Sequence, residues 1–174
     1  MSEREDYYLN LNLSYLKNLK TDIAKTEIIS DFKVVCAENG LPILSKNGIL
    51  YNSSKNPIEE TVDLFKNLEN NPENLCIIFG LELGYSLKYF SENFKGYIIL
   101  FENDLELIKY VFQNNSLIEY ISKQKFSIAT STENLKNMLN EIKKSDNIKH
   151  INIVANKMYS NIYEKFIAES YQYE

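Results

Sequence analysis

The sequence predicts an α/β fold in which helices cover both faces of a mostly parallel sheet. From residue 56 onward, four short apolar runs alternate with segments in which apolar residues recur at helical spacing. The first two runs, at 75–79 and 97–101, are almost wholly apolar, as is typical of strands buried on both faces. Right-handed crossovers between successive parallel strands give a doubly wound, Rossmann-like domain.

Residues 1–55 are predicted to form an N-terminal helix and a small β-hairpin flap. The turn signals "ENGLP" and "KNG" separate three short strands, at 32–37, 42–45 and 49–51. We expect this flap to lie at the edge of the main fold and the whole chain to form one compact unit. An amphipathic helix is predicted by apolar residues at spacings of three and four, which are Leu9, Leu13, Leu16, Leu19 and Ile23.

Residues 56–174 are expected to form the α/β domain itself. Its first helix has Asn56 as the N-cap, Pro57 at the first helical position and Glu59 three residues after the cap. The other expected elements are strands at 75–79, 97–101, 126–129 and 148–154 and helices at 84–90, at 104–113, after a Thr130–Glu133 capping box, and around 159–167.

Composition and charge exclude several classes of function. Acidic residues outnumber basic ones, 24 to 19, and Arg4 is the only arginine. Proteins that bind nucleic acid display a dense basic face with arginines, so no nucleic-acid partner is expected. No apolar stretch approaches the ~20 residues that span a membrane, and no signal peptide opens the chain, so the expected location is the cytoplasm. Cys36 and Cys76 lack metal-ligand spacing, and no metal site is predicted.

A glycine turn, "GLELG" from Gly80 to Gly84, follows the first strand of the alternating region. In open α/β sheets, ligands lie at the carboxyl ends of the strands where the strand order reverses, and this turn is the leading candidate for that place. Glu82 stands where a dinucleotide fingerprint has its middle glycine, and its carboxylate would repel a pyrophosphate, so NAD is disfavoured. Glu102 follows Gly84 by 18 residues, which resembles the ribose-binding acid of S-adenosylmethionine-dependent methyltransferases.

The same residues also have a purely structural interpretation. Gly80 and Gly84 would then allow tight packing of the strand against the helix. The acidic run Glu102–Asp104 would cap the next helix, since Asn103 and Glu106 have capping-box spacing. A divalent cation at the acidic run is a further alternative.

A polar loop before the helix at 56 is a second candidate site. Its residues Tyr51, Asn52, Ser53 and Asn56 either line a pocket or satisfy the free N–H groups of that helix. His150, the only histidine, falls near the start of the last strand, with no cysteine or carboxylate at a spacing typical of a triad or a metal site. We therefore interpret His150 as a surface or strand-edge residue.

Three stretches resemble the bacterial motility-associated factor (Maf) proteins, a family of flagellin glycosyltransferases. The stretch "ILYNSSKNPIEETVDLF" is similar to the family's "YSxYDPxxEA" segment, and "IIFGLELGYSLKYF" to its "GxGLGYHL" turn. The third, "IILFEND", resembles the "EPD/N" strand end that follows. The resemblance is most specific from Tyr51 to Asp104. It implies a ligand site at the turn and the next strand end, with the candidates Gly80, Glu82, Gly84, Tyr85, Glu102, Asn103 and Asp104.

The resemblance also implies a function and partners. Members of the family are similar to enzymes that transfer nonulosonic acids from a CMP-sugar to serine or threonine of flagellin. This chain departs from the family's motifs at Asn56, Ser86 and Asn103, so catalytic residues stay unassigned. In the full-length proteins the catalytic domain follows this region. The implied role is therefore that of an N-terminal scaffold or substrate-positioning domain, not catalytic alone, whose partners are flagellin and a downstream transferase domain.

Two alternatives of other classes stay open. The first is a methyltransferase-like enzyme that binds S-adenosylmethionine at the glycine turn and Glu102, in place of a CMP-nonulosonic acid. The second is a non-enzymatic interaction module with no small ligand, in which an apolar C-terminal face mediates contacts, including those of a homo-oligomer.

Overall fold

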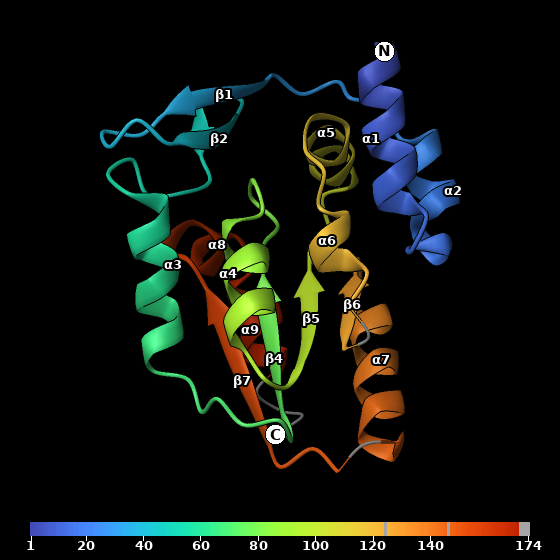
Figure 1. The fold of residues 1–174 in the computed structure, drawn as a ribbon, viewed down its shortest axis with the longest axis vertical. Helices are drawn as coiled ribbons and strands as arrows, with labels where there is room; N and C mark the ends of the chain where they lie inside the picture. Colours follow the sequence, from blue (N-terminus) through green and yellow to red (C-terminus); the bar gives the residue numbers. More distant parts are fainter. Residues whose placement is uncertain (124, 146, 171–174) are drawn as a thin grey trace.

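A four-stranded parallel sheet forms the centre of the molecule, as Figure 1 shows for this computed structural model, which describes residues 1–123, 125–145 and 147–170. The strand order is β6-β5-β4-β7, and all three pairs are parallel. The strands are β4 (Asn74–Phe79), β5 (Tyr97–Phe101), β6 (Phe126–Ala129) and β7 (His150–Ala155). The predicted doubly wound α/β fold is therefore confirmed.

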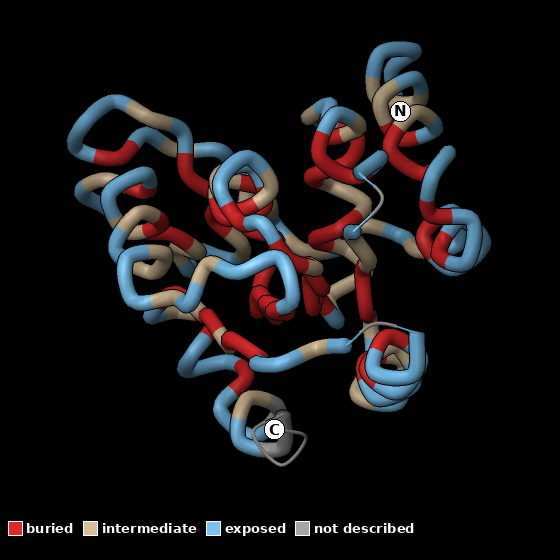
Figure 2. The backbone as a smooth tube through the Cα atoms, turned by 60° about the horizontal axis from the view of Figure 1, so that its bottom comes forward, coloured by how far each residue is buried: buried red, intermediate tan, exposed pale blue. Residues whose placement is uncertain are grey.

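Helices cover both faces of this sheet, which explains the apolar sequence of its central strands. All six residues of β4 are buried, and they face the two sides alternately: Cys76 and Ile78 join one core, whereas Ile77 and Phe79 join the other. Figure 2 shows these strands as the buried centre of the chain trace. The first core is covered by α4 (Tyr85–Asn93), α5 (Leu105–Asn114) and α6 (Ile118–Ile121), and the second by α7 (Thr132–Ser145), α8 (Lys157–Ile162) and α9 (Glu164–Ser170).

The N-terminal segment forms two helices, α1 (Glu3–Leu13) and α2 (Lys17–Lys25), where the sequence predicts one. The five apolar residues that predict the helix are all buried. The apolar spacing continues through the break between the helices, and neither glycine nor proline marks it. Helix α1 packs along α5, and the side chain of Asn12 forms three hydrogen bonds with α5 and the segment after it. The Asn12 Nδ2 donates to the carbonyls of Phe112 (3.0 Å) and Asn115 (2.7 Å), and its Oδ1 accepts the N–H of Leu117 (2.8 Å).

The predicted flap is a three-stranded antiparallel sheet that lies over the carboxyl ends of the parallel strands (Figure 1). Its strands are β1 (Phe32–Cys36), β2 (Pro42–Lys46) and β3 (Ile49–Leu50). Two contacts hold β2 on the main fold. Lys46 forms an ion pair with Asp104, and the Tyr85 hydroxyl donates to the Pro42 carbonyl at 2.6 Å.

Helix starts agree only partly with the capping predictions. Asn56 caps α3 (Pro57–Lys66) as predicted, and its Oδ1 accepts the N–H groups of Ile58 and Glu59. Helix α5 is capped by Asp104 instead of Asn103: the Asp104 Oδ1 accepts the N–H of Leu107 at 3.2 Å.

The start of α7 corrects a second capping prediction. Its first turn is capped by Ser131, whose Oγ accepts the N–H of Asn134 at 3.1 Å. The predicted Thr130–Glu133 box is therefore wrong. Thr130 instead donates its own N–H to the side-chain oxygen of Asn134 at 3.2 Å, so the helix starts one residue later than the spacing suggests.

Candidate functional site

The glycine turn lies at the point where the strand order reverses. Strands β4, β5 and β6 follow one another in one direction across the sheet, and β7 then pairs on the other side of β4. The carboxyl ends of β4 and β7 are therefore neighbours, with Phe79 paired to Ala155. In open α/β proteins the crevice at such a place is where ligands bind.

A tyrosine ring fills the space beside Gly80. The backbone of Gly80 has a φ of +107°, and a β-carbon built there would lie 2.3 Å from ring atoms of Tyr159. Tyr159 comes from α8, directly after β7, and is fully buried. Gly84, with a φ of +91°, takes the N-cap position of α4. The first glycine thus admits a side chain of the protein itself, at the position where other α/β folds admit a ligand.

Glu82 points inward from the turn and is held by donors from three segments. Only 1% of its surface is exposed. One carboxylate oxygen accepts the N–H of Ser86 at 2.8 Å, and the other accepts the Nδ2 groups of Asn52 and Asn156, the latter at 3.1 Å. Burial raises the pKa of Glu82 to about 8. The carboxyl group joins the polar loop, the glycine turn and the segment after β7.

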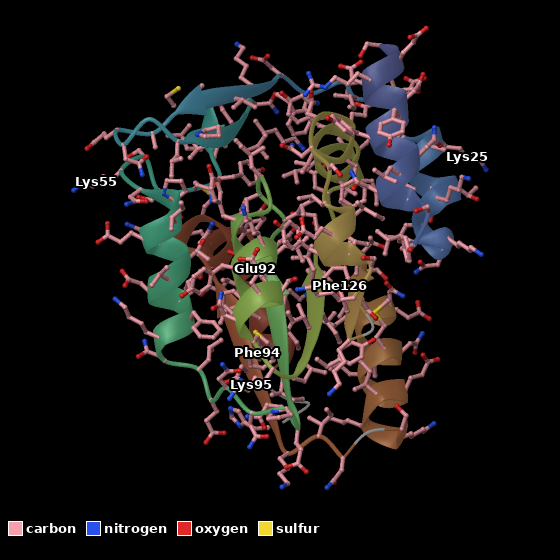
Figure 3. The ribbon with its side chains drawn as sticks, in the orientation of Figure 1. Lys25, Lys55, Glu92, Phe94, Lys95 and Phe126 are labelled. Atoms are coloured by element: carbon pink, nitrogen blue, oxygen red, sulfur yellow. The ribbon has the colours of Figure 1, made fainter. Side chains whose placement is uncertain are left out.

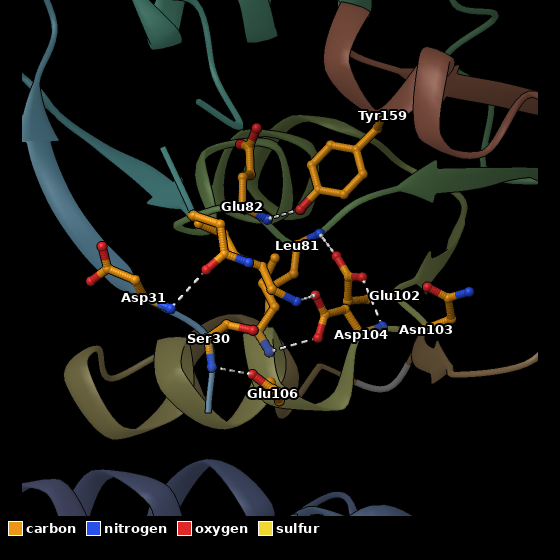
Figure 4. Close-up of polar contacts among 12 residues, drawn as sticks. Ser30, Asp31, Leu81, Glu82, Glu102, Asn103, Asp104, Glu106 and Tyr159 are labelled. Atoms are coloured by element: carbon orange, nitrogen blue, oxygen red, sulfur yellow. Dashed lines mark hydrogen bonds and ion pairs between the residues drawn. The ribbon is translucent and has the colours of Figure 1, made fainter. Parts of the chain in front are cut away.

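Glu102, at the end of β5, is also completely buried and fully engaged (Figure 4). Its Oε2 accepts the N–H of Leu81 at 3.1 Å, and its Oε1 accepts the N–H of Asp104 at 3.1 Å and the Tyr163 hydroxyl at 2.6 Å. Burial raises the pKa of this carboxyl group above its ordinary value. A ribose bound as in a methyltransferase would have to replace these donors.

Three residues that complete the site lie far along the chain. Asn156 and Tyr159 follow β7, and Tyr163 follows α8. The Tyr159 hydroxyl accepts the N–H of Glu82 at 2.9 Å, and its ring lies 5.4 Å from that of Tyr51. Burial, with the charges of nearby carboxylates, raises the pKa of Tyr51 to about 12. The sequence predicts only a helix around 159–167 for the segment that holds Tyr159 and Tyr163, and no local signal links these residues to the two glutamates.

The structure brings eight of the candidate residues into three groups. Asn52 donates to Glu82, and the ring of Tyr159 lies against both Gly80 and Tyr51. Asp104 and Tyr85 contact the flap. Ser53 and Asn56 satisfy backbone N–H groups around the start of α3: the Ser53 Oγ accepts those of residues 55 and 56, and Asn56 caps the helix. The structural role predicted as an alternative for the polar loop is thus present, and Asn52 and Ser53 also line a cavity.

The described residues offer little support for a histidine-based site, a metal site or a membrane-spanning helix. His150 is exposed at the start of β7. In the part of the chain that the structure describes, no three histidine, cysteine or acidic side chains gather as metal ligands would. Over the same residues, no helix has both the length and the apolar character needed to cross a bilayer.

Comparisons with known proteins show a likeness of fold. No family model and no curated protein sequence matches the chain. Among solved structures, the MAf glycosyltransferase from Magnetospirillum magneticum AMB-1 superposes with a TM-score of 0.57 at 11% sequence identity. The match covers 98% of this chain and 35% of that one, so the chain spans about a third of the length of this structural neighbour. The chain therefore has a Maf-like fold.

Proposed function

We propose that the chain is a Maf-like domain of protein glycosylation that positions a transferase domain or its flagellin substrate and does not itself transfer the sugar. The donor of the reaction would be a CMP-activated nonulosonic acid, bound by the transferase domain. The observation that carries this proposal is the fold likeness, which extends over 98% of the chain. The resemblance of the segment from Tyr51 to Asp104 to Maf motifs points to the same family.

The packing around the glycine turn, where the strand order reverses, supports a positioning role over a catalytic one. Tyr159 fills the space beside Gly80, and Glu82 and Glu102 direct their carboxyl groups to donors of the protein itself. A catalytic acid or base must reach a proton of the substrate within hydrogen-bonding distance. These two carboxyl groups are buried and already engaged, which favours a structural role for them.

The test combines a transfer assay with a binding assay. Purified chain, flagellin and a CMP-activated nonulosonic acid are incubated together, and the intact mass of flagellin is measured. We expect no mass increase with this chain alone. In parallel, surface plasmon resonance should detect binding to flagellin or to a separate Maf transferase domain, with a dissociation constant on the order of micromolar.

The two assays have separate meanings. A mass increase equal to one sugar, produced by the chain alone, would contradict the positioning role, because it would show a complete active site. Absence of binding to both flagellin and the transferase domain would contradict the proposed partners. Heat-denatured chain serves as the control for adsorption in the binding assay.

A further inference from the structure

Glu82 and Asn52 meet where the polar loop after β3 contacts the glycine turn. Both are buried, with 1% of Glu82 and 6% of Asn52 exposed. Asn52 is on the inner side of the loop, whereas Lys55 points outward at its rim in Figure 3. Within the described part of the chain, Glu82 takes part in no ion pair. Burying a carboxylate without a cation is unfavourable, so the neutral, protonated form of the group competes with the charged one.

The hydrogen bonds of Glu82 in the structure suit its ionised form. Its Oε1 accepts the N–H of Ser86 at 2.8 Å, and its Oε2 accepts the Nδ2 of Asn156 at 3.1 Å and the Nδ2 of Asn52. All three partners are donors, whereas a protonated carboxyl oxygen is itself a donor and needs an acceptor. A proton on Glu82 therefore requires that one of these partners present an acceptor instead.

Two of the three partners are fixed as donors. Ser86 contributes a backbone N–H from the first turn of α4. The amide of Asn156 is held at both ends: its Oδ1 caps α8 by accepting the N–H of Tyr159 at 3.0 Å, and its Nδ2 also donates to the carbonyl of Tyr51 at 2.8 Å. Turning this amide over would break both bonds, so Asn156 cannot supply the acceptor.

Asn52 is the partner that can change. Its Oδ1 is a buried atom that has no hydrogen-bond partner among the residues that the structure describes, so turning the amide over breaks no bond of this oxygen. A carboxamide has an acceptor at one end and donors at the other, and it can therefore serve either form of a carboxyl group. Buried polar atoms are rarely left unpaired. A second state, in which the Oδ1 faces a protonated Glu82, gives this atom its partner.

We propose that Glu82 and Asn52 form a proton-operated switch between the glycine turn and the polar loop. When the Oε2 of Glu82 carries a proton, the Oδ1 of Asn52 accepts it. When this proton passes to water, the amide turns over and its Nδ2 donates to the carboxylate. The loop transmits the change to the flap, because the N–H groups of residues 38 and 39 donate to the carbonyls of residues 54 and 55, at 2.8 and 3.2 Å. This proposal does not depend on the proposed role in glycosylation.

The titratable groups around Glu82 set the pH at which the switch operates. Burial raises the pKa of Glu82 to about 8, and the negative charge of Glu60 on α3 acts in the same direction. Glu102, at the end of β5, is a second buried carboxyl group with a raised pKa. Tyr85 of α4 and Tyr159 of α8 have pKa values that burial also raises, so both hydroxyls stay protonated over this range. The proton that leaves near neutral pH is therefore that of Glu82.

A nuclear magnetic resonance titration of the full chain, from about pH 5 to about pH 10, tests the switch. Carbon spectra follow the side-chain carboxyl group of Glu82, and ¹H–¹⁵N spectra follow the side-chain amide of Asn52. We expect both to change with one midpoint, between about pH 7 and about pH 9, and the backbone amides of residues 38 and 39 to move with them. A constant Asn52 signal while Glu82 titrates would overturn the switch, as would a Glu82 already ionised at about pH 5. Constant amides at 38 and 39 would overturn the link to the flap.

Three variants identify the two members of the switch. Glu82→Gln should make the Asn52 signal independent of pH, and a midpoint that persists there would show that another group drives the amide. In Asn52→Asp only acceptors face Glu82, so the two carboxyl groups should keep one proton to a pH at least about 1 unit higher, which is a tenfold weaker acid. Asn67→Asp places the same charge at the exposed end of α3 and should move the midpoint by less than about 0.3 unit. Equal shifts in the two aspartate variants would overturn the direct contact.

Discussion

The ring of Tyr159 lies where a β-carbon on Gly80 would stand, 2.3 Å from the nearest ring atoms. The two residues are 79 positions apart in the sequence, and their contact closes the crevice between β4 and β7. Glycine is needed here for two reasons. A side chain would collide with the Tyr159 ring, and the φ of +107° is unfavourable for residues other than glycine.

The first prediction concerns this contact. Gly80→Ala should lower the free energy of unfolding by about 2–4 kcal/mol, because a strained backbone and an overpacked core add together. Urea unfolding followed by circular dichroism measures it. Gly40→Ala is the control: its φ is +84°, but a β-carbon there meets nothing within 4 Å. An equal loss in both variants would mean that the Tyr159 contact contributes nothing.

The second prediction concerns pH. The pKa of Glu82 is raised from 4.5 to about 8 by burial. Between these values the folded protein holds a proton that the unfolded chain has lost. Its stability should therefore fall as the pH rises from about 5 to about 8, by up to about 1.4 kcal/mol per pH unit. Glu60 and Glu102, whose pKa values are also raised by burial, act in the same direction.

Urea unfolding at a series of pH values from 5 to 9 tests this expectation. Glu82→Gln removes the titrating group and should make the decline shallower, so that the variant gains on the original chain as the solution becomes alkaline. Glu92→Gln, on the exposed surface of α4, should keep the original slope. An unchanged slope in Glu82→Gln would show that this carboxyl group is ionised in the folded protein throughout.

The third prediction concerns the donor to Glu102. Tyr163→Phe keeps the ring, whose centroid lies 5.4 Å from that of Phe101, but removes the hydroxyl that donates to Glu102 at 2.6 Å. A buried carboxyl group that loses a donor should cost about 1–3 kcal/mol of stability. Thermal and urea unfolding measure the change. Tyr97→Phe removes a less buried hydroxyl, which contacts Ser127, and should cost less. The reverse order would contradict a stabilising role for Tyr163.

The fourth prediction concerns the flap. The ammonium group of Lys46 pairs with Asp104 and lies 5.3 Å from the centroid of the Phe32 ring. Both members of the ion pair are largely buried, so Lys46→Met should cost about 1 kcal/mol and speed hydrogen exchange in β1 and β2. Lys33→Met breaks an exposed pair with Asp31 and should change little. Equal exchange rates in the two variants would mean that Lys46 does not hold the flap.

The layered fold could be predicted because its signals are local. The apolar runs that became β4 and β5 lie between turn residues, and Asn56 with Pro57 marks a helix start on its own. Two features had no such signal. Helix α6 has only four residues, too few for a periodic pattern, and the break between α1 and α2 falls inside an unbroken run of apolar spacing.

The site could be predicted only in position. The glycine turn was placed correctly at the strand ends, because sheet topology dictates that place. What fills it was not predictable, since Tyr159, Asn156 and Tyr163 reach Glu82 and Glu102 from 61 to 77 positions away. Spacing along a chain describes one element at a time, whereas these contacts form only when β7 and α8 pack beside β4.

Asn12 sets an order of events during synthesis on the ribosome. Its three hydrogen bonds reach residues 100 to 105 positions later in the chain. The apolar face of α1 therefore stays without its main partner until α5 has left the exit tunnel. The flap has only local pairings and can close long before that. Until α5 is available, Leu9 and Leu13 of α1 lack the surface that covers them in the folded protein.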